Sequence, residues 1–271
     1  MVFPDGMHRI AIGIEYNGDA FHGFQRQITA TSTVQAYIEK ALSKVANEAI
    51  TVVCAGRTDA GVHASEQVLH FDTLSARQDS AWVRGVNTNL PDDIRVHWAK
   101  PVTQHFHARF CATSRIYRYV SIVSKVRPAC LGNQVTWLTK APDLEAMQTA
   151  GKYLIGKHNF NAYRAVKCQA PNPIRTVEVL QIYKHGAFIV MQIQANAFLH
   201  HMVRNIMGVL FEIGRGAQPP SWAKEVLLTE DRTSAAATAK PDGLYLVKAV
   251  YPESFELPKL PLGPLFIGDM N

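Results

Sequence analysis

The sequence predicts an α+β protein made of two similar halves, each an antiparallel sheet with helices on one face. Two observations support this prediction. Hydrophobic patterns follow the order β, α, β, β, α, β over residues 1–110, and nearly the same order returns over residues 111–271. The chain has 271 residues and is 47% hydrophobic, which is enough for a sizeable core and excludes a disordered chain.

The first half is expected to begin with a strand over residues 9–15, where Ile10, Ile12 and Ile14 alternate with smaller or polar residues. A Gly-rich loop over 16–31 follows. Apolar residues then recur at helical spacing from 34 to 45, with Ser32 or Thr33 as the N-cap. The remaining expected elements are strands over 50–54, 67–71 and 94–98 and a short helix near 82–86 that ends before the 90–91 Leu-Pro pair.

The second half is expected to contain a strand over 116–123 and a helix over 144–154. Two further strands flank Lys184-His185-Gly186, a hairpin signal. An apolar helix from His201 to Ile213, a helix over 222–228 and a strand over 244–250 complete this half. The tail from Pro252 to Asn271 contains four prolines and is expected to wrap the surface.

Positive charge is concentrated in the middle of the chain. The formal net charge is +6, but residues 111–215 alone carry 13 basic and 4 acidic side chains, a net charge of +9. A polyanion is therefore expected to bind this stretch. The four cysteines form no CxxC pair, which favours a reducing compartment, and neither a signal peptide nor a membrane helix is expected.

Residues 56–63, Gly-Arg-Thr-Asp-Ala-Gly-Val-His, form the most unusual segment. Asp and Gly favour turns, and Arg57 can be solvated, so the segment fits an ordinary loop. Alternatively, Asp59 is a carboxylate at the end of a strand that acts as a nucleophile or base. The flanking glycines would then let a substrate backbone approach closely. The residue types alone leave both interpretations open.

Arg204 lies near the start of the long apolar helix, where the dipole disfavours a cation by about 0.3–1 kcal/mol. It is therefore expected to face an anion, either a carboxylate such as Asp59 or a phosphate, unless it is an ordinary surface arginine. His200 precedes Arg204 by four residues and is expected to share its helix face.

Basic and aromatic residues alternate over 115–119. Strand geometry places Arg115, Tyr117 and Tyr119 on one face, which suits base stacking and phosphate contact. Ordinary tyrosine packing explains the pattern as well. His105 and His107 resemble half of a metal site, but no further ligand has fitting spacing, so no metal is expected and phosphate contact fits better.

Several segments, in order along the chain, resemble motifs of the tRNA pseudouridine synthase A family. Residues 55–64 are similar to its catalytic loop. Residues 16–25 are similar to its N-terminal motif, with Phe24 where a Trp is common. The other similar segments are 106–110, 117–119, 201–205, 243–246 and, as in the tail of bacterial members, 263–266. The resemblance covers nearly the whole chain.

This resemblance implies an isomerase that converts uridine to pseudouridine at positions 38, 39 and 40 in the anticodon stem-loop of tRNA. The base is detached at N1 and rejoined through C5 without redox change, so no cofactor is expected. The target base must be flipped out of its stack, which costs a few kcal/mol.

The resemblance also implies roles for individual residues. Asp59 is the essential aspartate, which either attacks C1′ or removes a 2′ proton. Arg204 is its basic partner, and Tyr117 stacks on the flipped uracil and assists proton loss from C5. The residues that it implies for substrate binding are Arg57, which supports flipping, Leu244 beneath the base, His107, Arg109 and Arg118.

For the fold, the resemblance implies two ferredoxin-like halves that form a continuous, mostly antiparallel sheet with a central RNA-binding cleft. Residues 1–110 would carry the catalytic Asp loop, and residues 111–271 the basic RNA-binding face and the Pro-rich tail. The implied partners are tRNA and a second copy of the chain, with no DNA and no membrane, and the implied location is the cytoplasm.

Two other functions are weighed against this one. A non-catalytic RNA-binding protein would use the same basic surface but would have no need of Asp59. A hydrolase would combine Asp59 with His63 and would cleave the chain or release the base, whereas an isomerase leaves the mass of the RNA unchanged.

Overall fold

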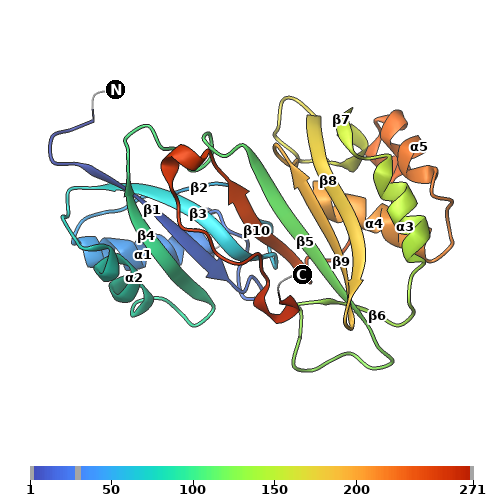
Figure 1. Cartoon of the computed structure of the whole chain (residues 1–271), viewed down its shortest axis with the longest axis horizontal. Coiled ribbons are helices and arrows are strands. Elements are labelled where there is room, and N and C mark those ends of the chain that lie inside the picture. Colours follow the sequence, from blue (N-terminus) through green and yellow to red (C-terminus); the bar gives the residue numbers. More distant parts are fainter. Residues whose placement is uncertain (1–2, 28–31, 269–271) are drawn as a thin grey trace. The chain divides into compact units, whose positions relative to one another are not determined.

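A computed structural model describes residues 3–27 and 32–268. The chain divides into two compact units: Met1–Thr113 together with Tyr245–Asn271, and Ser114–Leu244. We call them the first and the second unit. Within the described residues they contain ten strands and five α-helices, a mixed α/β architecture with mostly antiparallel pairing (Figure 1).

The first unit follows the element order that the sequence predicts. Its elements are β1 (His8–Tyr16), α1 (Val34–Ala46), β2 (Val53–Cys54), β3 (His63–Thr73), α2 (Asp79–Asn87) and β4 (Ile94–Val102). The strands lie in the order β4-β1-β3, all antiparallel, and β2 also pairs antiparallel with β3. Of the two expected N-caps, Thr33 is correct, since its hydroxyl accepts a hydrogen bond from the Ala36 amide.

A strand from the far end of the chain completes the first unit. β10 (Leu244–Val250) pairs parallel with β3, with Tyr245 opposite His63. The sequence places residues 245–271 in the second half, whereas the described part of this segment, 245–268, packs with the first unit. This segment packs there because β10 pairs with β3 and because the tail packs against the core of the first unit.

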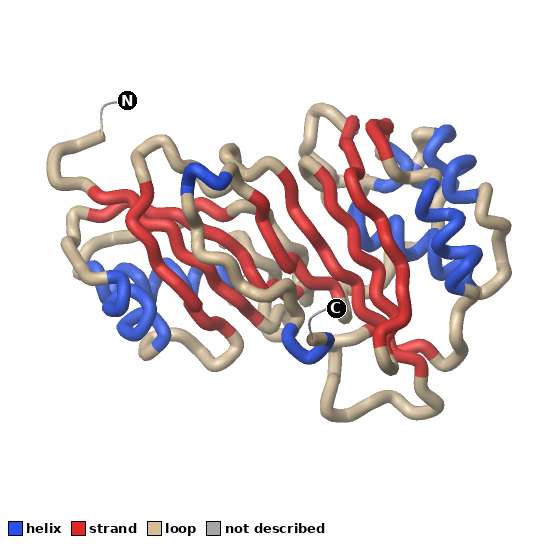
Figure 2. Tube along the Cα trace, viewed as in Figure 1, coloured by secondary structure: helices blue, strands red, loops and turns tan. Residues whose placement is uncertain are grey.

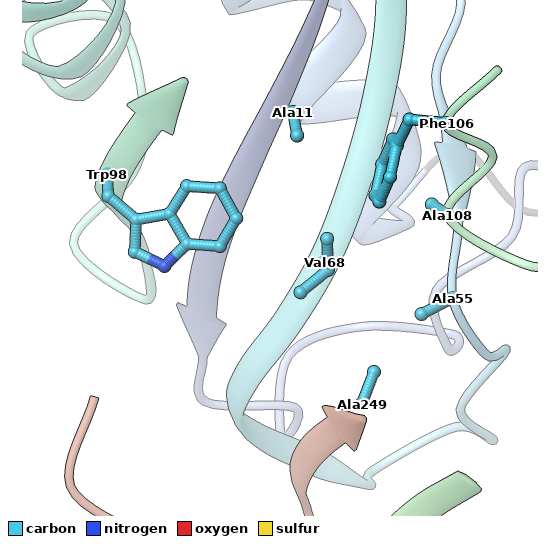
Figure 3. Packing of buried hydrophobic residues seen from close by; sticks show 7 residues of the cluster. All are labelled: Ala11, Ala55, Val68, Trp98, Phe106, Ala108 and Ala249. Carbon is cyan, nitrogen blue, oxygen red and sulfur yellow. The ribbon is translucent and has the colours of Figure 1, made fainter. Parts of the chain in front are cut away.

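This core consists of seven buried residues on the first unit (Figure 3). They are Ala11, Ala55, Val68, Trp98, Phe106, Ala108 and Ala249. Partly buried side chains of the tail pack against them, namely Tyr251, Phe255, Leu257 and Leu260. The expected surface tail is thus a cover that buries apolar area, and this burial stabilises its position.

The second unit contains five strands and three helices, drawn red and blue in Figure 2. Four of the strands pair antiparallel in the order β5-β9-β8-β7, and β6 pairs parallel with β5. Its elements are β5 (Ser114–Val123), β6 (Thr136–Leu138), α3 (Leu144–Lys152), β7 (Gly156–Asn159), β8 (Ile174–His185), β9 (Phe188–Ala195), α4 (Met202–Gly214) and α5 (Trp222–Thr229). The predicted order omits β6 and β7. Both are short, and β7 has the sequence Gly-Lys-His-Asn, which carries no hydrophobic alternation.

None of the helices within the described ranges, 3–27 and 32–268, combines the length and the apolar character that a membrane crossing requires.

Candidate active site

Asp59 lies in the loop between β2 and β3 of the first unit, and its side chain is half-buried. The loop closes on itself because the Val62 amide donates to the Asp59 carbonyl at 3.1 Å. At its start, the Ala55 amide donates to Val68, and Gln67 bonds both the amide and the carbonyl of Gly56. The backbone that carries the carboxylate is therefore fixed to β3 rather than left mobile.

The segment after β1 holds the same loop from its other side. The Phe24 amide donates to the Thr58 carbonyl at 3.1 Å, and the Tyr16 hydroxyl bonds the Thr58 hydroxyl at 2.8 Å. A Cβ at Gly18 would lie 2.1 Å from the Val62 carbonyl oxygen. At Gly23, where φ is +85°, it would lie 2.8 Å from the Thr58 carbonyl oxygen. The two motifs at 16–25 and 55–64 thus form one packed structure that requires these glycines.

His63 ends the loop and is only 1% exposed. Its Nδ1 accepts a hydrogen bond from the Gly18 amide at 3.0 Å, and its Nε2 lies 3.9 Å from a carboxylate oxygen of Asp19. The imidazole stacks on Tyr245 at 4.7 Å, and Phe266 packs edge-on against the same tyrosine. The motifs at 243–246 and 263–266 therefore reach the base of the Asp59 loop through His63.

Arg57 is exposed on the Asp59 loop. His107 and Arg109 lie on a second loop of the first unit, between β4 and β5, where Arg109 is exposed and His107 is half-buried. The two loops are attached to the same hydrophobic core, because Ala55 and Ala108 belong to one buried cluster (Figure 3). No group of three metal-ligand side chains in the described part of the chain includes His105 or His107.

Tyr117 and Arg118 lie side by side on β5 of the second unit and point to opposite faces of the sheet. Tyr117 is 7% exposed and packs edge-on against Phe198, with ring centroids 5.0 Å apart. Arg118 is 1% exposed and donates from Nε to the side chain of Gln192 on β9. Arg118 is thus built into the sheet in this conformation.

Arg204 lies in the first turn of α4, the position near the helix start that the sequence predicts. Its Nε donates to the Ala239 carbonyl at 2.8 Å, while the Ala239 amide donates to the Arg204 carbonyl. The next residue, Asn205, is fully buried and accepts a hydrogen bond from Thr238. The segment after α5 therefore fixes both the helix start and the direction of the guanidinium.

The expected helix face shared by His200 and Arg204 is wrong. α4 begins at Met202, because His201 adopts the left-handed conformation with φ of 62° and acts as the N-cap. His200 precedes the helix in a turn, and its ring lies 4.1 Å from that of His201. A spacing of four residues therefore does not place His200 above Arg204.

Leu244 is the first residue of β10 and is 3% exposed. The residue before it, Gly243, accepts a hydrogen bond from Val120 on β5 and donates to the Asn133 carbonyl. Leu244 itself donates to the Pro241 carbonyl. These bonds fix where β10 begins and hence which way the leucine side chain is presented.

Sequence reasoning missed several polar residues of β3. Glu66 is 5% exposed, and burial raises the pKa of its carboxyl to about 7. His70 is 4% exposed, and burial lowers the pKa of its imidazole to about 4. The available signal was their presence in a strand whose neighbours Val68, Leu69 and Phe71 are apolar.

Known proteins match this chain over the segments that carry most of these motifs. The family model described as tRNA pseudouridine synthase matches residues 12–111 and 150–252. A protein of Enterobacter sp. (strain 638) named tRNA pseudouridine synthase A is 56% identical over 97% of this chain and 97% of its own. One of the same name from Shewanella amazonensis is 57% identical over 96% of this chain and 100% of its own.

Among solved structures, a Cbf5-Nop10-Gar1 complex has a TM-score of 0.35 and 11% identity, covering 88% of this chain and 48% of that one. That likeness is too weak to support any argument about the fold. The sequence matches are separate findings, and they extend over nearly all of this chain and of its relatives. The chain therefore belongs to the tRNA pseudouridine synthase family.

Proposed function

We propose that this protein isomerises uridine to pseudouridine at positions 38, 39 and 40 in the anticodon stem-loop of tRNA, with Asp59 as the essential catalytic carboxylate. Family membership supports uridine isomerisation in tRNA. The role of Asp59 is supported by the structure of its loop, which hydrogen bonds and close glycine contacts hold from both sides. A carboxylate on a fixed backbone is preorganised for attack or for proton removal.

The reaction breaks the bond between N1 and C1′ and forms one between C5 and C1′. C5 then loses a proton and N1 gains one, so atoms and electrons balance without a redox partner. In this proposal the ionised Asp59 either attacks C1′ or removes the 2′ proton. Arg204 supplies the cation that favours the ionised form, since an opposite charge nearby stabilises a carboxylate.

Two residues of the second unit are proposed to hold the flipped uracil. Tyr117 stacks on it and assists proton loss from C5, and Leu244 lies beneath it. Both side chains are held in one direction, Tyr117 by Phe198 and Leu244 by the hydrogen bonds at the start of β10. Because these two side chains are already ordered, less conformational entropy is lost when the base binds.

Charge supports docking of the tRNA backbone on the second unit. Residues 114–244 carry 16 basic and 8 acidic side chains, a net charge of +8, whereas the rest of the chain is slightly negative. Arg57, His107 and Arg109 of the first unit are proposed to add contacts, Arg57 by supporting the flipped state. Arg118 is proposed to contribute from within the sheet, by fixing β5 through Gln192, because its burial leaves no surface for RNA.

The finer architecture is also part of the proposal: two ferredoxin-like halves, a continuous sheet with a central RNA-binding cleft, a homodimer and a cytoplasmic location. The β, α, β, β, α, β order of the first unit and its β4-β1-β3 pairing support the ferredoxin-like designation.

The alternative hydrolase needs His63 as a partner of Asp59. The Nδ1 atom of His63 accepts a hydrogen bond from Gly18, and its Nε2 lies near Asp19. One face of the imidazole stacks on Tyr245, so these contacts hold the ring in the loop. This geometry favours the isomerase, in which His63 only supports the loop.

The test is to incubate the protein with a tRNA transcript without added metal and to map pseudouridine chemically. We expect conversion at positions 38–40 with unchanged RNA mass. Asp59→Asn is expected to abolish conversion while tRNA affinity changes by less than about tenfold, or ~1.4 kcal/mol. Asp92→Asn is the matched control, because the Asp92 side chain is fully exposed. Substantial conversion by pure Asp59→Asn protein would refute the assignment, and base release would favour the hydrolase.

A further inference from the structure

Phe110 is a large apolar side chain that the first unit leaves in water. It is 75% exposed, although it lies in an ordered loop between β4 and β5. Its ring lies nearly parallel to that of His107, with centroids 4.3 Å apart and an interplanar angle of 28°. The guanidinium carbon of Arg109 lies 5.5 Å from the Phe110 ring centroid. An imidazole, a cation and a phenyl ring, all from residues 107–110, therefore meet around one exposed side chain.

The support beneath Phe110 is rigid. Nδ1 of His107 accepts hydrogen bonds from the amides of Arg109 and Phe110, both at 3.2 Å. Below it lies the buried ring of His70, 4.8 Å away, whose Nδ1 accepts from the Ala108 amide. Burial lowers the pKa of His107, which favours the neutral imidazole, and a neutral ring can accept these bonds at Nδ1. The stack is consequently formed before any ligand binds, which keeps the ordering cost of binding small.

The same loop is anchored next to the Asp59 loop. Phe106 and Ala108 belong to the buried cluster that also contains Ala55, the residue directly before Gly56 and Arg57 (Figure 3). The Phe110 stack and the catalytic loop are therefore attached to one core of the first unit. The two loops therefore share one buried support within the first unit.

We propose that Phe110, backed by His107, is a stacking platform for an unpaired base of the tRNA, with Arg109 contacting the adjacent phosphate. An exposed aromatic ring beside a cation matches a nucleobase followed by its phosphate, and stacking tolerates any base because each has a π-face. The platform would hold the strand near the target uridine while that uridine is flipped. The inference depends on the proposed function in one respect, that the ligand is the substrate tRNA.

The test measures affinity for an anticodon stem-loop RNA as a function of salt. Phe110→Ala is expected to weaken binding by about tenfold, because stacking of a single base is lost. The slope of log affinity against log salt is expected to stay unchanged, whereas Arg109→Ala flattens it by about one unit. Phe110→Trp restores affinity, and Phe110→Leu does not. Leu74→Ala is the matched control, since Leu74 is a 57% exposed apolar residue after the far end of β3.

A second readout is the fluorescence of 2-aminopurine placed at unpaired positions of the same RNA. Wild type and Phe110→Trp are expected to quench it at one position, and Phe110→Ala is not. Equal affinity of Phe110→Ala and wild type would overturn the inference. So would lost self-association with unchanged RNA affinity, which would make the ring a contact between copies of the chain. Failure of the proposed function is distinguishable, since wild type would then bind RNA without converting positions 38–40.

Discussion

Glu66 gives a stability prediction whose size follows from the structure. Its carboxyl is buried on β3, and burial raises its pKa from an ordinary 4.5 to about 7, with Lys248, Trp98 and His97 offsetting part of the rise. Between pH 4.5 and 7 the folded state keeps the proton and the unfolded state loses it. Folding is therefore destabilised as pH rises, by up to about 3 kcal/mol at 1.36 kcal/mol per pKa unit.

Glu66→Gln removes this penalty, because glutamine resembles the protonated acid and cannot ionise. We expect the variant and the wild type to have similar free energies of unfolding near pH 4.5. At pH 8 the variant is expected to be more stable by about 3 kcal/mol. The measurement is urea unfolding across this pH range, with the difference between the two proteins at each pH as the result.

The difference is needed because His70 acts in the opposite direction. Its pKa is lowered to about 4, so the stability that it contributes is complete above pH 6.5 and is lost as pH falls toward 4. In the wild type the two effects partly cancel, whereas the Glu66→Gln variant retains only that of His70. A constant difference between variant and wild type from pH 4.5 to 8 would refute the reasoning.

Two further predictions concern the Asp59 loop. Gly18→Ala places a Cβ 2.1 Å from the Val62 carbonyl oxygen and must displace the loop, so we expect single-turnover conversion to fall sharply with a stability loss of about 1–3 kcal/mol. Gly85→Ala, whose Cβ meets only the Val45 side chain at 3.2 Å, is the control, and equal turnover of both variants would contradict the clamp. Arg57→Ala is expected to lose turnover on a paired target uridine and to recover part of it on an unpaired one, because less unstacking is needed. Equal impairment on both substrates would show that Arg57 does not support flipping.

Local patterns were enough to predict most of the elements. The alternating isoleucines of β1 and the helical spacing of α1 are signals within a few residues, and both predictions are confirmed. The start of α4 was missed by one residue, because the left-handed conformation of His201 has no signature in its residue type. The role of Gly18 could not be predicted either, because it depends on a contact with Val62, which is distant in the sequence.

The buried polar residues of β3 show a second reason for such failures. Glu66 and His70 lie on β3, which pairs with β10, and Val68 between them belongs to the core against which the tail packs. These partners lie well over a hundred residues later, and sequence periodicity does not report on them. The pairing of β10 with β3 likewise joins segments far apart in the chain, which a local pattern does not reveal.

The return of β10 to the first unit has a consequence for synthesis. As the polypeptide leaves the ribosome, the strands β1 to β4 emerge first but lack Tyr245, Ala249 and the apolar tail that complete their core. The second unit, by contrast, is a continuous stretch and can finish folding earlier. The stack of His63 on Tyr245, which supports the base of the Asp59 loop, forms only when nearly the whole chain has been made. A nascent chain can thus expose the basic second unit to RNA before the Asp59 loop has gained its last support.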